Sequence, residues 1–218
     1  MINRPTTEEE KQNGEAIGVI RASRLVRKLA HCHEEINMET VSKIHAEIFK
    51  NVWPEIAGKY RQENLKITDS KHLPPHWSKV PSLMKEKDEK LKSKLRKLKK
   101  IEGIAFEGKK NPQIVLREIN KIVKVSSWIH HSITFIHPFR EGNGRTARLA
   151  ANLILERFGL IGISIKIEKE NKNKYRAALA QADSRYDYRP LENLIFKGIK
   201  DRYEGVVIKF YDYGKKKL

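Results

Sequence analysis

The chain has 218 residues, of which 39% are hydrophobic, and its formal net charge at pH 7 is +18. This length and composition fit one domain with a core of ordinary size, so a second full domain is not expected. The chain has no run of 18 apolar residues, and acidic residues instead of a signal segment follow its N-terminus, which predicts a cytoplasmic protein without membrane contact. The single cysteine, Cys32, excludes an internal disulfide and a multi-cysteine zinc site.

The excess of positive charge suits polyanionic partners such as nucleotides, nucleic acid or acidic protein surfaces. Much of it lies in residues 85–100, where the only apolar side chains, Leu91, Leu95 and Leu98, are four and three positions apart. This spacing predicts an amphipathic helix with a charged, solvated outer face. A dedicated nucleic-acid surface is the alternative to that interpretation, and nucleic acid is not the partner that we expect.

Helical periodicity dominates the chain. The first predicted helix begins near Thr7, which can form a capping box with Glu10. Its expected apolar side consists of Ile17, Ile20, Leu25, Val26 and Leu29. A second helix is predicted over residues 38–49.

Residues 54–81 form a long connecting segment, because one glycine and four prolines interrupt the helical pattern there. Within it, apolar and polar side chains alternate from Leu65 through Lys66 and Ile67 to Thr68, which predicts a short strand or one arm of a hairpin. Long irregular segments inside compact domains are often functional, so this segment is a candidate for docking a substrate.

The second half of the chain returns to helix. Residues from Asn111 to Ile136 are too apolar for a surface element and predict a central buried helix, which ends before His137 because a proline follows that residue. Further helices are predicted over residues 144–158, 170–183 and 189–204. The expected fold class is therefore mostly α with one small β-hairpin.

Residues 137–148 read His-Pro-Phe-Arg-Glu-Gly-Asn-Gly-Arg-Thr-Ala-Arg and carry the residue types that phosphate chemistry needs. Gly142, Asn143 and Gly144 allow a tight turn that aims backbone amides at one point, and the next helix adds its positive N-terminal end. Arg145 and Arg148 share one helical face there, where the helix dipole disfavours cations unless an anion is bound between them.

Two further side chains complete this predicted anion site. Glu141 offers a hard oxygen ligand for a magnesium ion that bridges phosphates. His137 offers a base, because an ordinary imidazole is largely neutral at physiological pH and accepts a hydroxyl proton.

The same segment matches the motif HPFxxGNGRxxR of the Fic family at all eight fixed positions, and the chain resembles that family over most of its length. The resemblance implies a Fic-type helical bundle with a small β-hairpin flap. It implies a helical extension at residues 1–39, a Fic domain at 40–205 and a basic tail at 206–218.

The resemblance also implies a protein adenylyltransferase, which transfers AMP from ATP to a Tyr, Ser or Thr hydroxyl of a target protein. In that reaction His137 is the base and Glu141 holds Mg²⁺, while Gly142, Asn143, Gly144, Arg145 and Arg148 bind the phosphates. Tyr175 and Asp183 resemble residues of the family's adenine-side helix, although Asp183 often corresponds to Asn. The flap that docks the target corresponds to Leu65, Lys66, Ile67, Thr68 and Asp69.

Alternatives remain within and outside this resemblance. Some relatives transfer phosphate or phosphocholine, or remove AMP, and a basic helical protein that binds nucleic acid without catalysis is the alternative from another class. Many family members carry an inhibitory helix, but no segment here matches its pattern fully. A degenerate internal helix, a separate inhibitor protein and no inhibition at all stay open.

Overall fold

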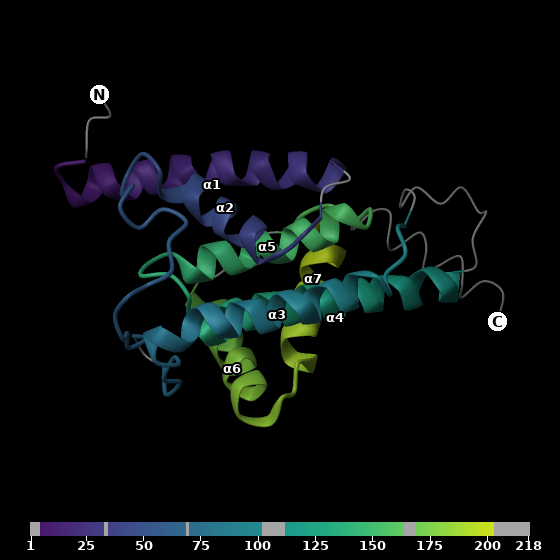
Figure 1. Cartoon of the computed structure of the whole chain (residues 1–218). Helices are drawn as coiled ribbons and strands as arrows, with labels where there is room; N and C mark the ends of the chain where they lie inside the picture. Colours follow the sequence, from purple (N-terminus) through teal and green to yellow (C-terminus); the bar gives the residue numbers. More distant parts are fainter. Residues whose placement is uncertain (1–4, 33–34, 69, 102–111, 164–168, 203–218) are drawn as a thin grey trace.

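The structure is a computed structural model that describes residues 5–32, 35–68, 70–101, 112–163 and 169–202. The described residues form a mostly helical bundle (Figure 1), which confirms the mostly α fold class. Its helices are α1 (Glu8–His31), α2 (Met38–Phe49), η1 (Trp77–Lys79), α3 (Val80–Leu95), α4 (Pro112–Ile136), α5 (Asn143–Arg157), α6 (Lys169–Arg185) and α7 (Arg189–Arg202). None of these helices is long and apolar enough to cross a membrane. The predicted tail, residues 206–218, lies outside the described residues.

Helices α4 and α5 form the centre of the bundle and run in opposite directions on either side of a short turn (Figure 1). Helices α1 and α2 pack on α5, α3 lies along α4, and α6 and α7 pack on the opposite side of α4. The turn between α4 and α5 consists of the residues in which the sequence predicts the chemistry. The fold therefore places that turn between the two most buried helices.

The core follows the expected helical spacing. Ile122, Ile129, Ile133 and Ile136 of α4 are fully buried at steps of seven, four and three residues. Each such side chain contributes about 1.5–3 kcal/mol when it leaves water. The opposing face of α5 buries Ala147, Ala150, Leu153 and Ile154. This apolar pairing fixes the two helix ends that hold the turn.

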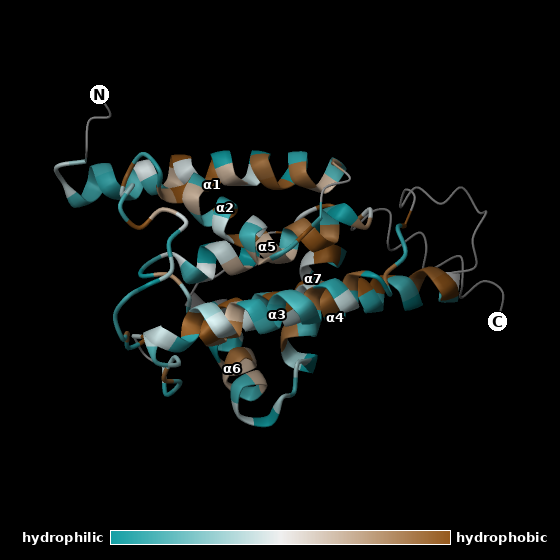
Figure 2. Cartoon of the chain, in the orientation of Figure 1, coloured by the Kyte–Doolittle hydropathy of each residue, from teal (hydrophilic) through white to brown (hydrophobic). Residues whose placement is uncertain are grey.

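Helix α1 begins as predicted, with a capping box between Thr7 and Glu10. Of its predicted apolar side, Val26 is buried and Leu29 packs on the core, but the first half of the helix buries a different face. Ile17 and Ile20 are 55% and 56% exposed. The buried side instead carries Gly18 and Ala22, and a Cβ at Gly18 would lie 2.0 Å from the carbonyl oxygen of Ile48. Figure 2 shows hydrophobic and hydrophilic segments alternating along α1, so hydropathy alone does not identify the packed face.

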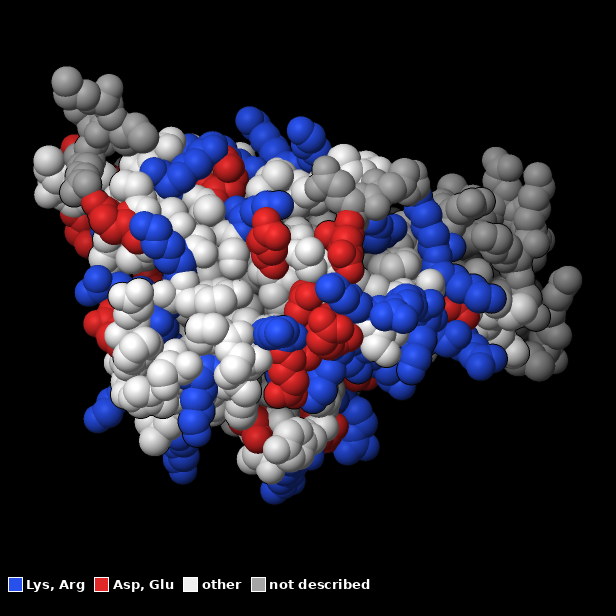
Figure 3. Space-filling view, viewed as in Figure 1, with Lys and Arg blue, Asp and Glu red and all other residues white. Residues whose placement is uncertain are grey.

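Helix α3 has the charged outer face that its sequence predicts, although it starts at Val80 and ends at Leu95. Four of its lysines pair with carboxylates one turn away, as in Lys92 with Asp88 at 3.2 Å, or lie over the ring of Trp128, as Lys94 does at 5.1 Å. Figure 3 shows acidic side chains gathered among the basic ones at the centre of the visible face. The structure thus uses the charge of this helix in local contacts.

The predicted β-hairpin is wrong for the described residues, where residues 65–68 form an irregular loop. Side chains rather than a strand ladder close this loop: the guanidinium of Arg61 donates to the carbonyl of Glu63 at 2.8 Å and to that of Pro75. Asn64 Oδ1 accepts the Trp77 N–H at 3.0 Å. Alternating polar and apolar residues are a weak signal for a strand, because a closed loop can also turn alternate side chains inward and outward, as Leu65 and Ile67 are partly buried here while Lys66 and Thr68 are exposed.

Candidate functional site

A loop that is closed by its own side chains connects α4 to α5. Asn143 Oδ1 accepts the Phe139 N–H at 2.9 Å, and Asn143 Nδ2 donates to the Phe139 carbonyl at 2.7 Å. The chain turns at Gly142, whose φ is 72° and where a Cβ would lie 2.4 Å from the ring of Phe49. Only glycine fits there without strain. Both polar atoms of the buried Asn143 side chain are hydrogen bonded to the Phe139 backbone. Asn143 can therefore offer its main-chain N–H to a ligand.

His137 lies at the start of this loop in a left-handed backbone conformation, with φ 53°. Its Nδ1 is 3.2 Å from the carbonyl oxygen of Thr134. Because a carbonyl only accepts, Nδ1 carries the proton and Nε2 keeps its lone pair. Burial is the largest cause that lowers the pKa of His137, and the charge of Arg61 lowers it further. The imidazole is therefore held neutral, in the state that a general base requires.

Arg61 fixes the strained turn at His137, and no sequence pattern assigned it this role. Its Nε donates to the His137 carbonyl at 2.8 Å, and its own N–H donates to the Pro138 carbonyl at 2.8 Å. The residue is 4% exposed. A cation suits the carboxyl end of α4, where carbonyl groups lack helical partners. That preference cannot be read from the sequence, because 76 positions separate Arg61 from His137.

His45 of α2 holds the next part of the loop. Its Nδ1 accepts the Gly58 N–H at 2.9 Å, so the proton is on Nε2, which donates to the Glu141 carbonyl at 3.0 Å. Burial lowers the pKa of His45 to about 4, and its ring stacks on Phe139 with centroids 3.9 Å apart. A neutral histidine thus sets the main-chain position of Glu141.

The anion end of the site is the N-terminus of α5. Within the described part of the chain, no side chain caps this terminus, so the positive end of the helix dipole and its first amides stay available. Arg145 and Arg148 both lie in the first two turns of α5. The Arg148 side chain extends back toward Gly144, since a Cβ added at Gly144 would lie 3.5 Å from Arg148 Nη1. The structure therefore brings the two predicted guanidinium groups to the end of the helix that attracts anions.

Glu141, the predicted metal ligand, lies beside these groups. Its Oε1 accepts the Gly142 N–H at 2.9 Å and is 3.5 Å from Arg145 Nη2. The side chain is 53% exposed. No group of three or more metal-ligating side chains occurs among the described residues. One carboxylate beside an anion site fits Mg²⁺, which takes few protein ligands and several oxygens from phosphates and water.

The two predicted adenine-side residues lie on α6 in different settings. Tyr175 is buried, and its hydroxyl is hydrogen bonded to Arg148 and is 3.2 Å from His130 Nε2. Because arginine only donates, the hydroxyl proton faces His130 and the Tyr175 oxygen holds Arg148 in place. Asp183 instead accepts a hydrogen bond from His131 Nε2 at 2.8 Å.

The loop predicted to dock a target lies against the carboxyl end of α4. His72 Nε2 is 2.7 Å from the Phe135 carbonyl oxygen, two residues before His137. Within the loop, Lys66 and Thr68 are exposed, whereas Leu65 and Ile67 are partly buried. Asp69 lies outside the described residues. Leu73, 70% exposed, adds an apolar surface that sequence analysis did not identify.

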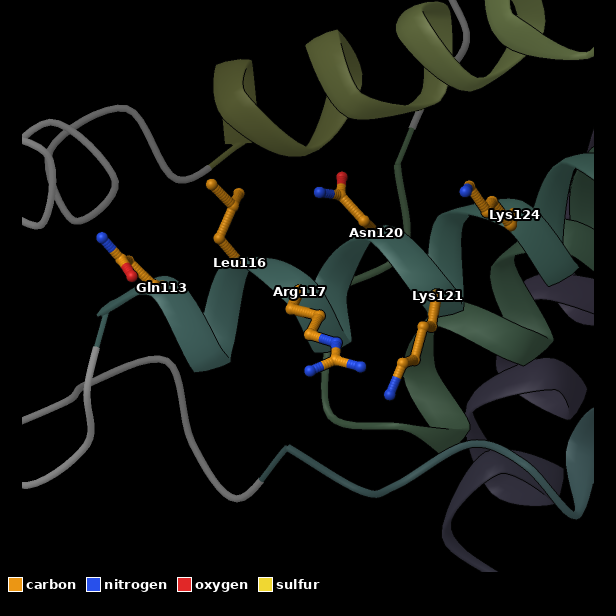
Figure 4. A pocket seen from close by; sticks show the side chains of 6 residues that line it. All are labelled: Gln113, Leu116, Arg117, Asn120, Lys121 and Lys124. Atoms are coloured by element: carbon orange, nitrogen blue, oxygen red, sulfur yellow. The ribbon is translucent and has the colours of Figure 1, made fainter.

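A hollow of about 440 Å³ lies elsewhere, on the amino-terminal half of α4 (Figure 4). Its lining includes the cations Arg117, Lys121 and Lys124. Thirteen residues of helix, about 20 Å at 1.5 Å per residue, separate Lys124 from His137. This hollow is therefore separate from the site around the loop.

Comparisons with known proteins agree with this arrangement. Residues 35–155 match the Fic/DOC family. The chain is 28% identical over 173 residues to the protein adenylyltransferase Fic of Nematostella vectensis, which covers 79% of this chain and 35% of that protein. It is also 28% identical over 172 residues to a probable protein adenylyltransferase of Aquifex aeolicus, which covers 78% of this chain and 45% of that protein. The chain thus spans less than half the length of either relative.

Solved structures support the fold. Fic-1 (residues 134–508) from C. elegans superimposes with a TM-score of 0.69 at 22% identity, covering 98% of this chain and 56% of that one. The Bartonella tribocorum effector BepC, solved with bound AMPPNP, gives a TM-score of 0.64 at 15% identity, covering 89% of this chain and 88% of that one. At these identities the likeness concerns the fold.

Proposed function

Because the chain belongs to the Fic/DOC family, we propose that it transfers AMP from ATP to a Tyr, Ser or Thr hydroxyl of a target protein. One observation carries the proposal: the unprotonated Nε2 of His137 and the arginine-bearing N-terminus of α5 stand at the two ends of one short turn. A base next to an anion site suits the transfer of a phosphorus group to a hydroxyl. The names of the two curated relatives support the same reaction.

In the proposed step, the oxygen of the target hydroxyl attacks the α-phosphorus of ATP. A new oxygen–phosphorus bond forms, the bond from the α-phosphorus to the bridging oxygen breaks, and pyrophosphate leaves. Nε2 of His137 takes the hydroxyl proton, since Nδ1 is occupied by its own proton and the Thr134 carbonyl. The buried Arg61 keeps the imidazole in position by holding the backbone on which it is mounted.

The α5 end of the turn would bind the nucleotide phosphates. The main-chain amides of residues 143 and 144 would face the α-phosphate, and Arg145 and Arg148 the β- and γ-phosphates, since guanidinium groups match phosphate oxygens in pairs. Glu141 would hold a magnesium ion, which neutralises phosphate charge when it is bound. The AMPPNP in the BepC structure supports a nucleoside triphosphate as the ligand.

The α6 residues would act at the other end of the nucleotide. Asp183 has a carboxylate oxygen free to accept from the adenine amino group while Oδ1 is held by His131. Tyr175 is buried behind Arg148, so we propose that it acts on the phosphates through that arginine instead of touching adenine.

The target would dock on the closed loop that lies against α4. Its anchors reach both sides of the start of the catalytic turn, since Arg61 donates to the His137 carbonyl and His72 lies within hydrogen-bond distance of the Phe135 carbonyl. The exposed side chains of Leu73 and Lys66 offer an apolar and a cationic contact. A separate protein that inhibits the enzyme remains part of the proposal for its regulation.

Labelled ATP tests the proposed reaction. The protein is incubated with a cell extract and Mg²⁺, with ATP labelled either at the α-phosphate or at the γ-phosphate. AMP transfer leaves only the α label on protein, because the β- and γ-phosphates depart together. Exclusive γ labelling would show phosphate transfer and would overturn the proposal. Release of AMP from a modified protein without new labelling would identify the reverse activity.

A further inference from the structure

Glu15 of α1 forms an ion pair with Arg145, one of the two arginines at the N-terminus of α5. Its carboxylate oxygen Oε2 accepts from Arg145 Nη1, and its side chain is only 12% exposed. Glu15 is 130 positions from Arg145 in the sequence and lies before residues 35–155, the part that matches the family. A helix outside that match therefore contributes a charged group to the candidate site.

Small residues on α1 make this contact possible. A Cβ at Gly18 would lie 2.0 Å from the Ile48 carbonyl oxygen, and one at Gly14 would lie 2.7 Å from the Val52 side chain. These close approaches let α1 settle onto the end of α2, and Glu15 stands one turn before Gly18. A larger residue at either glycine would move the helix, and the carboxylate with it.

Arg145 needs such a partner. A guanidinium in the first turn of a helix is opposed by the helix dipole, so an unpaired arginine there would turn away into water. Three contacts prevent this: Nη1 is paired with Glu15, Nη2 is 3.5 Å from Glu141, and the guanidinium carbon is 5.2 Å above the ring of Phe49. Arginine has five N–H donors, so pairing one nitrogen with Glu15 leaves others for phosphate.

We infer that Glu15 is a positioning residue, which holds Arg145 in the orientation that binds the terminal phosphates of the nucleotide. The inference rests on the proposed function, because it takes ATP as the ligand. Glu15 fixes the outer side of the guanidinium, and Nη2 stays on the side of Glu141, where a magnesium-bound triphosphate would lie. The charge of Glu15 also offsets one of two neighbouring cations when no nucleotide is bound.

The test measures how strongly the protein prefers ATP over AMP. Dissociation constants for ATP–Mg²⁺ and for AMP are measured by calorimetry on the full chain, for the wild type, Glu15→Gln and the matched control Glu9→Gln, an exposed carboxylate on the same helix. We expect the ratio of affinities for ATP over AMP to fall about tenfold in Glu15→Gln and to stay unchanged in Glu9→Gln. A loss of folded protein lowers both affinities equally, so the ratio does not respond to a merely structural role.

Two further variants complete the design. In an Arg145→Ala background, Glu15→Gln should change the ratio no further, since the group that it positions is gone. Glu15→Asp, which keeps the charge on a shorter side chain, should restore part of the preference and serves as the test if Glu15→Gln does not fold. An unchanged or increased ratio in the Glu15 variants would overturn the inference.

The wild type separates this inference from the proposed function. If it binds ATP and transfers the α label, but Glu15→Gln keeps the wild-type ratio, only the role of Glu15 is wrong. If the wild type neither binds ATP nor transfers the label, the proposed function fails and the inference fails with it.

Discussion

The turn between α4 and α5 and the contact between α1 and α2 both bring backbones close together, but by opposite means. In the turn, polar side chains pin the chain: Asn143 holds Phe139, His45 holds Glu141, and Arg61 holds His137. In the helix contact the close approach depends on missing side chains, at Gly14 and Gly18. Side-chain hydrogen bonds hold the turn, whereas the absence of side chains at two glycines allows the contact between α1 and α2.

This difference has a functional consequence. Hydrogen bonds fix the direction of each group, so the turn can aim a base and an anion site at one ligand. Small residues fix only a distance, so the α1 contact positions Glu15 without taking part in binding itself. Substitutions in the turn should therefore act on catalysis and binding directly, and those in the α1 contact first on stability.

The largest effect is expected at the base. His137→Ala should lower the rate of AMP transfer about a thousandfold, because the imidazole that accepts the hydroxyl proton is then missing. ATP affinity should change little, since the arginines and the α5 terminus remain. Transfer is followed with α-labelled ATP and affinity by calorimetry. A variant with the wild-type rate would show that another group accepts the proton.

A substitution in the contact between α1 and α2 should lower the stability of the protein. Gly18→Ala places a Cβ 2.0 Å from the Ile48 carbonyl oxygen, so the helices must separate, which we expect to lower the free energy of unfolding by about 2 kcal/mol. Because separation also withdraws Glu15, the preference for ATP over AMP should fall as well. Denaturant unfolding and nucleotide titration check the two effects. An unchanged stability would mean that this contact tolerates a methyl group.

Two buried histidines near the turn, His45 of α2 and His130 of α4, make stability depend on pH. Burial lowers the pKa of His45 to about 4 and that of His130 to about 3, whereas unfolded histidine titrates near 6.5. As the pH falls below about 6.5, each of these histidines becomes protonated in the unfolded chain but stays neutral in the folded chain. The free energy of unfolding therefore decreases by about 1.4 kcal/mol per pH unit for each histidine. Melting temperatures measured from pH 7.5 to 5 should therefore decrease, and His45→Gln should flatten the decrease. A decrease of the same steepness in this variant would contradict the account.

The smallest effect is expected on the outer face of α1. Ile17→Ala should change the free energy of unfolding by less than about 0.5 kcal/mol, because Ile17 is 55% exposed. The same denaturant measurement that is used for Gly18→Ala provides the comparison. A loss of 2 kcal/mol or more would show that this isoleucine has a packing partner.

Patterns within one segment predicted well. The boundaries of α2, the end of α4 at Ile136 and the start of α5 near Gly144 follow from helical spacing, proline and glycine, all of which act on neighbouring residues. The order of His137, just after α4, and of Arg145 and Arg148, in the first two turns of α5, follows for the same reason, because all three belong to one short segment. Their roles in binding and catalysis remain predictions.

Contacts between distant segments could not be predicted in this way. Hydropathy predicted burial of Ile17 and Ile20, which are exposed. The packed face carries Gly18 instead, and a hydropathy pattern does not identify a glycine as a packing residue. Residues 65–68 alternate as a strand does, but Arg61, Asn64 and His72 fold them into a loop. The contact between Tyr175 of α6 and Arg148 of α5 likewise joins two segments that no local pattern relates.

The sequence by itself determined most of the helices, the burial of the second half of α4 and the set of reactive groups in residues 137–148, since these depend on spacing and chemistry along the chain. Only the tertiary structure decided which groups hold them: Arg61 for His137, His45 for Glu141, and Glu15 for Arg145. The physical reason is that each of these pairs spans at least 76 residues, and a contact over such a distance exists only after the helices have packed.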